Sequence, residues 1–222
     1  HWYGEMWNRK RNGELYAELI NITVVRDARG VARNYVALFT DITAMKEHQQ
    51  QLEHIAHYDS LTGLPNRVLL ADRLHQAIAQ ARRRETLMAL VYLDLDGFKE
   101  VNDTHGHLCG DMVLKQVAAS VSEHLRAEQV FARLGGDEFA VLCLETGLDG
   151  GRALAEKRRG RIAGVAFSRE GALFSVTCSF GIAERDAGMA MDHSLFEAAD
   201  RALYVAKGAG RNRGVTPPQP PS

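Results

Sequence analysis

Two adjacent carboxylates follow two adjacent glycines in residues 133–139, whose sequence is RLGGDEF. Short apolar runs flank this segment. Together with Gly135 and Gly136 they predict a β-hairpin, because glycine readily adopts the positive φ that tight hairpin turns need. Asp137 and Glu138 would repel each other at such a turn unless a cation lies against them. We therefore expect a positive charge beside this hairpin.

A third carboxylate, Asp94, ends an apolar run over residues 87–95, which predicts a central strand buried on both faces. If this strand and the hairpin are neighbours in one sheet, Asp94, Asp137 and Glu138 converge. Carboxylate oxygens at a strand end suit Mg²⁺, whose coordination shell is commonly completed by substrate phosphates. Residues 94–96 taken alone do not exclude the alternative of unconnected, exposed acids on loops.

The sequence contains no GxxxxGK[ST] pattern, so separate cations would have to hold the phosphates of any bound nucleotide. Lys99 follows the apolar strand, and Lys207 and Arg211 lie at the end of the last predicted helix. Asn102 and Asp111 carry an amide and a carboxylate that can hydrogen-bond a guanine edge. Each of these residues alone is more common as a surface charge, a helix cap or a turn residue.

Composition restricts the class of protein. The 222 residues are 45% hydrophobic, enough for one large domain or for one domain and an extra piece. A net charge of -1 favours neither nucleic acid nor a membrane surface as a partner, and no apolar run reaches the length of a membrane span. Three widely spaced cysteines fit reduced core thiols in a cytoplasmic protein. No leader sequence opens the chain, and we expect an excised piece of a longer protein.

The first 40 residues predict three antiparallel strands, at residues 2–8, 14–25 and 31–39. Three strands cannot bury an apolar face alone, so this piece must pack on a partner chain or has lost its other half. A helix is expected from Asp41 or Thr43 to about His57. Its apolar spacing fits either a short parallel coiled coil or an ordinary amphipathic helix.

From residue 66 the predicted order is helix, strand, helix, hairpin, helix, strand, helix. This order is too mixed for a doubly wound sheet and predicts an α+β fold, with a mixed, mostly antiparallel central sheet flanked by helices. We expect a loop at residues 103–107, a long helix through Arg126, a strand over residues 173–182 and a last helix over residues 193–208. The proline-rich residues 216–222 predict a tail.

Four motifs, in order, resemble those of the GGDEF domain of diguanylate cyclases, and the resemblance covers about residues 57–215. They are DSLTGLPNR at residues 59–67, DLDGFKEVND at 94–103 followed by HGHLCGD at 105–111, RLGGDEF at 133–139 and AKGAGRN at 206–212. Residues 1–44 resemble the C-terminal half of a PAS domain. The expected domains are thus a partial PAS domain at residues 1–42, a helical signalling linker at 43–57, the GGDEF domain at 58–215 and the tail.

The resemblance implies a bacterial enzyme that condenses two GTP molecules into cyclic di-GMP and releases pyrophosphate. It implies Mg²⁺ or Mn²⁺ bound by Asp94, the carbonyl of Leu95, Asp137 and Glu138. Asp137 or Glu138 would help deprotonate the ribose 3′-OH, and Lys99 would stabilise charge on the phosphates. Because one domain binds one GTP, catalysis would require a homodimer, controlled by the N-terminal PAS sensor.

The resemblance also implies the residues that bind GTP. Asn102 and Asp111 would recognise guanine, with His107 beside the nucleotide, and Lys207 and Arg211 would hold the terminal phosphates. The remaining positions expected at the nucleotide are Leu61, Gly135 and Gly136. Two alternatives remain, a catalytically silent module that binds GTP or cyclic di-GMP and a purely structural dimerisation fragment.

One position departs from the family pattern. The family's product-inhibition site is an Arg-x-x-Asp just before the signature, and residues 126–129 here are RAEQ. Arg126 is kept, but Gln129 stands at the aspartate position. A neutral amide cannot pair with an arginine or accept from guanine as a carboxylate does. We therefore expect a degenerate inhibitory site at Arg126 and weak or absent feedback inhibition.

Overall fold

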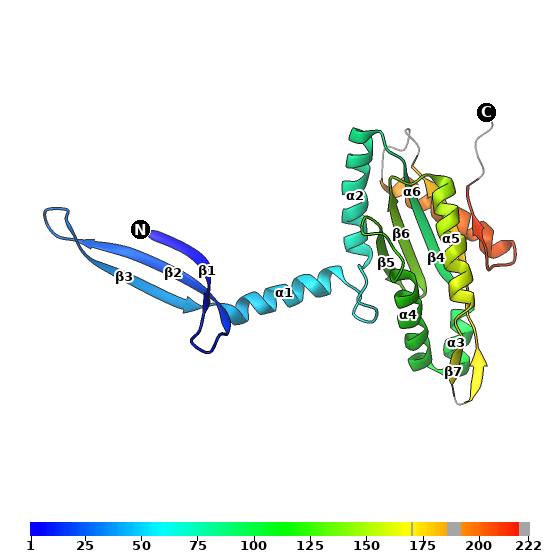
Figure 1. Cartoon of the computed structure of the whole chain (residues 1–222), viewed down its shortest axis with the longest axis horizontal. Coiled ribbons are helices and arrows are strands. Elements are labelled where there is room, and N and C mark those ends of the chain that lie inside the picture. The colour runs from blue at the N-terminus through cyan, green and yellow to red at the C-terminus, as the bar shows by residue number, and fades with distance from the viewer. Residues whose placement is uncertain (170, 186–191, 218–222) are drawn as a thin grey trace. The chain divides into compact units, whose positions relative to one another are not determined.

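The computed structural model describes residues 1–169, 171–185 and 192–217. The chain divides into two compact units, residues 1–56 and residues 57–222. The first unit contains three antiparallel strands in the order β1-β2-β3, which confirms the small N-terminal sheet (Figure 1). Its strands are β1 (Trp2–Arg9), β2 (Leu15–Arg26) and β3 (Ala32–Asp41), and α1 (Thr43–His57) follows them.

Much of the apolar surface of the small sheet is open to solvent. Trp7, Tyr35 and Phe39 are exposed, and the exposed fraction of Tyr35 is 71%. Only a few residues beside the start of α1 are buried, among them Ala17 and Ile20. The described part of the first unit thus supplies no second layer over these strands, as expected for three strands alone.

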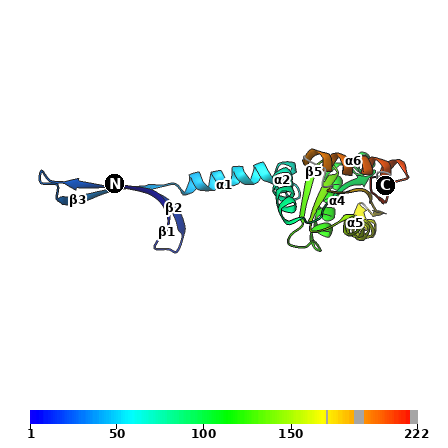
Figure 2. The ribbon, with the colours of Figure 1, turned by 90° about the horizontal axis from the view of Figure 1, so that it is seen from above.

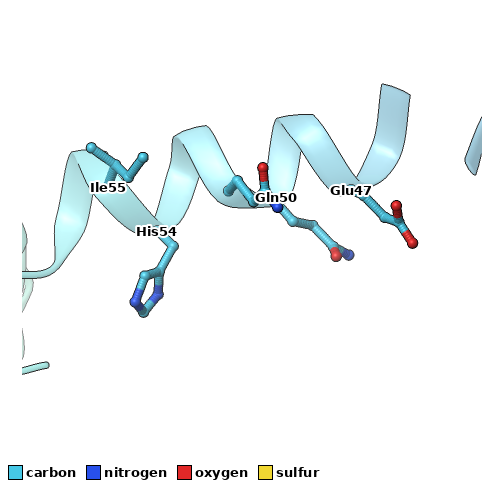
Figure 3. Close-up of a pocket in the computed structure, with 5 residues that line it drawn as sticks. Glu47, Gln50, His54 and Ile55 are labelled. Carbon is cyan, nitrogen blue, oxygen red and sulfur yellow. The ribbon is translucent and has the colours of Figure 1, made fainter. Parts of the chain in front are cut away.

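Helix α1 has no buried residue. Its apolar side chains Leu52 and Ile55 are exposed. Glu47, Gln50 and His54 project with Ile55 around a shallow hollow (Figure 3). Because one helix alone lines this hollow, it is not enclosed enough to be a candidate site.

The second unit is an α+β fold on a five-stranded sheet in the order β10-β9-β4-β6-β5. Strand β4 lies at the centre and pairs antiparallel with β6 and β9, β5 pairs antiparallel with β6, and the short β10 runs parallel to β9. The sheet is therefore mixed and mostly antiparallel, as predicted. Its strands are β4 (Met88–Asp96), β5 (Val130–Gly135), β6 (Glu138–Leu144), β9 (Thr177–Glu184) and β10 (Gly214–Val215).

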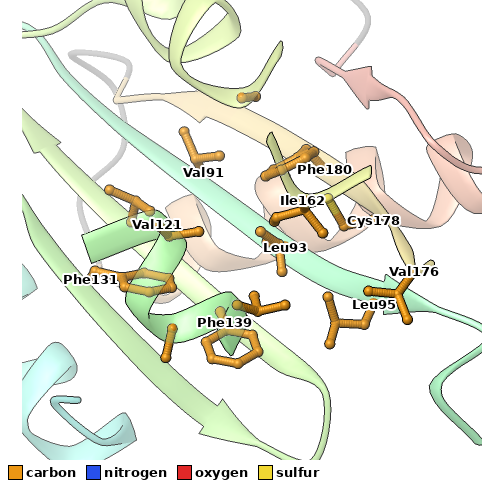
Figure 4. Packing of buried hydrophobic residues seen from close by; sticks show 14 of the residues in the cluster. Val91, Leu93, Leu95, Val121, Phe131, Phe139, Ile162, Val176, Cys178 and Phe180 are labelled. Carbon is orange, nitrogen blue, oxygen red and sulfur yellow. The ribbon is translucent and has the colours of Figure 1, made fainter. Parts of the chain in front are cut away.

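Helices cover both faces of this sheet, and α6 and α5 lie on opposite sides of it in Figure 2. Successive β4 side chains alternate between the two faces. Val91 and Leu93 pack into the cluster with Val121 and Ile162 (Figure 4), whereas Leu90 belongs to the cluster under α2 and α6. The central strand is thus buried on both faces, as predicted. The helices are α2 (Arg67–Arg84), α3 (Phe98–His105), α4 (His107–Ser122), α5 (Leu148–Ala163) and α6 (Asp192–Gly208).

Three predicted boundaries were wrong. Residues 103–107 form no loop, because α3 continues to His105 and only Gly106, at φ 81°, separates it from α4. Helix α4 ends at Ser122 and not at Arg126, since the chain must turn back to begin β5 at Val130. The strand expected over residues 173–182 is two strands, and β8 (Ala172–Phe174) pairs with β7 (Phe167–Arg169) outside the main sheet. Apolar side chains continue through the break because Phe174 and Val176 pack on the same core cluster.

Helix α6 crosses β9 at Gly181 with no room for a side chain. A Cβ there would lie 1.9 Å from the carbonyl oxygen of Ala199 and 2.4 Å from the amide nitrogen of Leu203. We expect Gly181→Ala to lower the free energy of unfolding by about 3 kcal/mol, because α6 must move off the sheet. Urea unfolding measures the effect.

Gly160 in α5 provides the control for this substitution, because a Cβ there meets no heavy atom within 4 Å. Gly160→Ala is expected to raise the free energy of unfolding by roughly 0.5–1 kcal/mol, as is usual in a helix. Equal urea midpoints for Gly181→Ala and the parent chain would contradict the close packing.

Candidate active site

The RLGGDEF segment forms the predicted hairpin between β5 and β6. Gly135 and Gly136 adopt φ values of 139° and 52°, in the region that favours glycine. A Cβ built on either residue meets no heavy atom of the described chain within 4 Å. The turn therefore presents bare backbone to open space, where a bound molecule can approach it closely.

Arg133 clamps this hairpin to the loop that opens the second unit. Its Nη1 donates to both carboxylate oxygens of Asp59 at 3.0 Å, and its Nε and Nη2 donate to the Gly136 carbonyl at 3.0 and 2.7 Å. Burial alone would raise the pKa of Asp59, but hydrogen bonds from Thr62 and Arg133 lower it below its usual value. Sequence reasoning did not assign Arg133 or Asp59 a role, although both lie inside motifs that it identified.

Asp94 and Glu138 lie directly opposite each other in the β4–β6 ladder. Directly opposed residues of an antiparallel pair project from the same face of the sheet. Asp94 is buried, and this burial raises its pKa, as do the nearby charges of Asp137 and Glu138. The Lys207 Nζ lies 2.7 Å from Asp94 Oδ2 and partly opposes that rise. The acids that the sequence predicted to converge thus influence one another.

Glu138 also faces a cavity of about 430 Å³ between α2 and α6. The hydroxyl of Tyr92 donates a hydrogen bond to Glu138, and Arg67 Nη2 lies 3.9 Å from its Oε2. Burial, followed by the charge of Glu138, raises the pKa of Tyr92 above its usual value. These neighbours orient the Glu138 carboxylate toward the α2–α6 face, and sequence reasoning had assigned neither of them to the site.

Helices α3 and α4 bring the two guanine candidates close together. A Cβ on Gly110 would lie 2.0 Å from Asn102 Oδ1, so Asn102 rests directly on the backbone of α4 beside Asp111. Gly110 is therefore a position that sequence reasoning overlooked, although it lies next to Asp111 within a motif. His107 begins α4 and is exposed, whereas Leu61 is partly buried against the core.

The candidate phosphate cations come from two elements. Lys99 is exposed in the first turn of α3, and Lys207 lies in the last turn of α6. Arg211 is exposed just beyond α6 with φ 62°, in the left-handed region. Lys207 is the cation that contacts these acids, through Asp94, whereas the described residues show no ion pair from Lys99 or Arg211 to them.

Comparison with known proteins identifies this arrangement. Residues 56–213 match the family described as "Diguanylate cyclase, GGDEF domain". The chain belongs to the GGDEF family. Diguanylate cyclase DgcP of Pseudomonas aeruginosa is 44% identical over 173 residues, 78% of this chain and 26% of that protein. Cyclic di-GMP phosphodiesterase PdeR of Escherichia coli is 39% identical over 188 residues, 83% of this chain and 28% of that protein. The chain therefore spans about a quarter of the length of these relatives.

A solved structure agrees with the fold. The coiled coil and GGDEF domain of DgcB from Caulobacter crescentus, in complex with c-di-GMP, superposes with a TM-score of 0.73 at 34% identity. The match covers 78% of this chain and 92% of that one. This likeness confirms the α+β architecture of the GGDEF domain and agrees with its mostly antiparallel sheet.

The acidic residues at the end of β4 and on the adjacent hairpin of this GGDEF domain have donor atoms that suit a magnesium ion. Asp94, Asp137 and Glu138 offer carboxylate oxygens, and Leu95 offers a backbone carbonyl, all of them hard ligands that Mg²⁺ prefers. Burial of Asp94 among like charges raises its pKa, and a cation would relieve that repulsion. Within the described ranges, no three His, Cys, Asp or Glu side chains are already gathered in a geometry that could hold a metal. Lys207 supplies the positive charge beside Asp94.

The segment expected to be a degenerate inhibitory site lies just before β5, at the opposite end of that strand from the RLGGDEF hairpin. Gln129 is turned inward, where its Oε1 accepts from the Arg126 amide at 3.1 Å and its Nε2 lies 3.7 Å from Cys143 Sγ. Arg126 and Gln129 line a cavity of about 300 Å³ together with Lys157 and the buried Arg158. The side-chain amide of Gln129 is thus engaged within the chain.

Proposed function

We propose that this chain is a diguanylate cyclase that condenses two GTP molecules into cyclic di-GMP and pyrophosphate. The observation that carries the proposal is the buried Asp94, opposite Glu138 in the ladder and 2.7 Å from Lys207. A buried carboxylate with acidic neighbours and a cation suits binding of a divalent metal and phosphates. Family membership and the diguanylate cyclases among the relatives support the same activity.

The mechanism assigns roles to residues of this chain. Phosphoryl transfer requires positioning and neutralisation of charge, and no protein nucleophile. Asp94, the Leu95 carbonyl, Asp137 and Glu138 would hold Mg²⁺ or Mn²⁺. When bound, the ion supplies charge that stabilises the phosphoryl oxygens. Asp137 or Glu138 accepts the proton of the ribose 3′-OH.

The remaining residues would hold GTP. Asn102 and Asp111 bind the guanine edge, and His107 and Leu61 lie beside the nucleotide. Lys99, Lys207 and Arg211 neutralise the phosphates. To reach a phosphate, the Lys207 ammonium would exchange its contact with Asp94. Gly135 and Gly136 let the nucleotide approach the hairpin backbone.

Two domains must meet for this reaction, because each contributes one bound GTP and the product joins both. We assign the pairing to the first unit and to α1, whose exposed Leu52 and Ile55 suit contact with a second copy. Residues 1–42 would be the C-terminal half of a PAS sensor and residues 43–57 the signalling linker. The residues beyond 217 lie outside the described part of the chain, and the proline-rich tail stays a prediction.

We propose that the protein acts in the bacterial cytoplasm, and the proposed substrate and the thiols support this setting. GTP is available in the cytoplasm of bacteria, and Cys109, Cys143 and Cys178 are buried and unpaired with one another. Reduced thiols are typical of that compartment. No helix in the described ranges is both long and apolar enough to cross a bilayer.

Incubation of the chain with GTP and Mg²⁺, followed by separation of the nucleotides, tests the proposal. Cyclic di-GMP and pyrophosphate are expected in a ratio of about one to two, which is the stoichiometry of the reaction. A parallel incubation with EDTA serves as the control and should yield neither product. A folded dimer that binds GTP but releases no cyclic di-GMP would favour the silent binding module. One relative is named a phosphodiesterase, which is the reason to test this alternative.

Feedback inhibition gives a further prediction. Because Gln129 replaces a carboxylate and is engaged with the Arg126 amide and Cys143, we expect cyclic di-GMP at low micromolar concentration to leave initial rates unchanged. Gln129→Asp should introduce inhibition, since a carboxylate can accept from guanine and pair with Arg126. Initial rates measured against added cyclic di-GMP test the unsubstituted chain and the Gln129→Asp variant. Inhibition of the unsubstituted chain that Arg126→Ala abolishes would refute the prediction.

A further inference from the structure

Asp96 lies two residues beyond Asp94 on the same face of β4, yet its carboxylate is held quite differently. Thr177 Oγ1 donates to its Oδ2 at 2.8 Å and Ser179 Oγ donates to its Oδ1 at 2.7 Å. The backbone amide of Asn212 donates to Oδ2 at 3.0 Å. Three donors thus occupy both oxygens, and Asp96 joins β4 and β9 to the segment after α6.

That segment has a backbone conformation that needs support. Arg211 and Asn212 both adopt positive φ, at 62° and 47°. Asparagine tolerates the left-handed region, but arginine with its Cβ does so at a cost in free energy. Such conformations persist where surrounding contacts fix them. Here the Arg211 amide donates to the Ala206 carbonyl at 3.1 Å, and Asp96 fixes the next amide.

The two aspartates therefore hold the AKGAGRN motif at two points on either side of Arg211. Asp94 contacts Lys207 before it, and Asp96 holds the amide of Asn212 after it. From this geometry we infer that Asp96 is a positioning residue, which fixes the turn at residues 211–212 and so aims Arg211 at the phosphates. The inference rests on the proposed function for its ligand, GTP. It assigns Asp96 no contact with the ion, because its oxygens are already occupied.

Other contacts near the turn act on different atoms. Arg159 donates to the side-chain oxygen of Asn212 at 2.9 Å, on the exposed surface. The Phe180 amide donates to the carbonyl of Arg213 at 2.8 Å and aligns β10. Asp96 is the acceptor for the Asn212 amide, and the Ser179 that holds it is fully buried. An acceptor whose own hydrogen bonds are satisfied in this way is rigid, and it restrains the backbone amide that donates to it.

Limited digestion with trypsin tests the turn without reference to GTP. The bond after Arg211 is the target, and the bond after Arg126, in an exposed turn elsewhere, is the reference. Asp96→Asn keeps the shape of the side chain but replaces one acceptor oxygen with a donor. We expect its cleavage after Arg211, relative to Arg126, to accelerate by at least about fivefold through local opening. Equal relative rates in the parent chain and the variant would overturn the inference.

Binding of a non-hydrolysable GTP analogue with Mg²⁺ tests the consequence. Asp96→Asn and Arg211→Ala should each raise the Kd by roughly tenfold, the scale of one charge-assisted contact. The double variant should bind no more weakly than Arg211→Ala alone, because Asp96 acts through Arg211. In turnover, Asp96→Asn should raise KM more than it lowers kcat. Additive losses in the double variant would overturn the positioning role.

Thr177→Val is the matched control, because it removes one donor to Asp96 and leaves the Asn212 contact in place. Its trypsin ratio and Kd should stay within about twofold of the parent values, since the carboxylate keeps two donors. A parent chain that binds no GTP analogue would contradict the proposed function. In that case the trypsin ratio alone would still test whether Asp96 fixes the turn at residues 211–212.

Discussion

Asp137→Ala is expected to abolish synthesis of cyclic di-GMP while leaving the fold nearly intact. The side chain lies on the hairpin turn and is only partly buried. The structural contact at this residue comes from its backbone carbonyl, which accepts from the Leu95 amide at 3.3 Å and is retained in alanine. Loss of one group that stabilises charge in the transition state typically lowers kcat by about 10²–10³-fold, and loss of a metal ligand acts in the same direction.

Pyrophosphate release measures this effect, and urea unfolding measures the fold. Glu128→Ala is the matched control, because it removes an exposed acid outside the site. That variant should keep the parent rate, and both variants should unfold within about 0.5 kcal/mol of the parent chain, as is usual for surface substitutions. Unchanged turnover in Asp137→Ala would remove Asp137 from the active site.

Arg133→Ala is expected to loosen the signature hairpin and to destabilise the whole domain. The substitution removes the hydrogen bonds that Arg133 donates to Asp59 and to the Gly136 carbonyl at 2.7–3.0 Å, and leaves both acceptors without this donor. The Arg133 and Asp59 side chains are only 11% and 21% exposed, so water replaces the lost contacts poorly. We expect a loss of about 2–3 kcal/mol in the free energy of unfolding, below the range for fully buried pairs. Turnover should fall with it, because the turn carries Asp137.

A double-mutant cycle with Asp59→Asn separates this pair from other effects, and a coupling energy of about 1–3 kcal/mol is expected. Arg84→Ala is the control, since Arg84 and Glu145 are 3.8 Å apart and more than 60% exposed. Such a surface pair contributes less than about 1 kcal/mol. A coupling energy near zero between Arg133 and Asp59 would refute the clamp.

The Arg133–Asp59 pair should also make the free energy of unfolding depend on pH, in a direction set by the pKa of Asp59. The folded-state pKa of Asp59 lies below its usual value of 3.8. A lowered pKa contributes stability above pH 3.8 and loses it as the pH falls through the folded-state value. The stability difference between the parent chain and Arg133→Ala should therefore shrink on acidification below that pH. Urea midpoints across the acidic range measure this difference.

Most of the second unit could be predicted because its signals are local. The helix predicted after residue 66 is α2, which buries the apolar stripe of Leu70, Leu74 and Ala77, and the apolar run of β4 is buried on both faces. The predicted boundaries were wrong where one continuous apolar pattern is divided between different elements of the fold. Phe174 and Val176 continue one apolar alternation, yet they belong to a side hairpin and to a linking segment. Periodicity reports burial, and it carries no information about which strand lies alongside.

The sequence by itself determined the family, the acidic hairpin and the set of candidate ligands, because motif spacing and glycine positions are local. Tertiary structure alone decided which partners Asp94 and Asp96, the two aspartates of the DLD motif, each contact. Both project from one face of β4, since residues two apart in a strand share a face. The antiparallel register with β9 sets Ser179 opposite Asp94 and Thr177 opposite Asp96, and α6 brings Lys207 to one carboxylate and Asn212 to the other. These partners lie more than 80 residues away in the chain, so only the packing of distant elements could assign them.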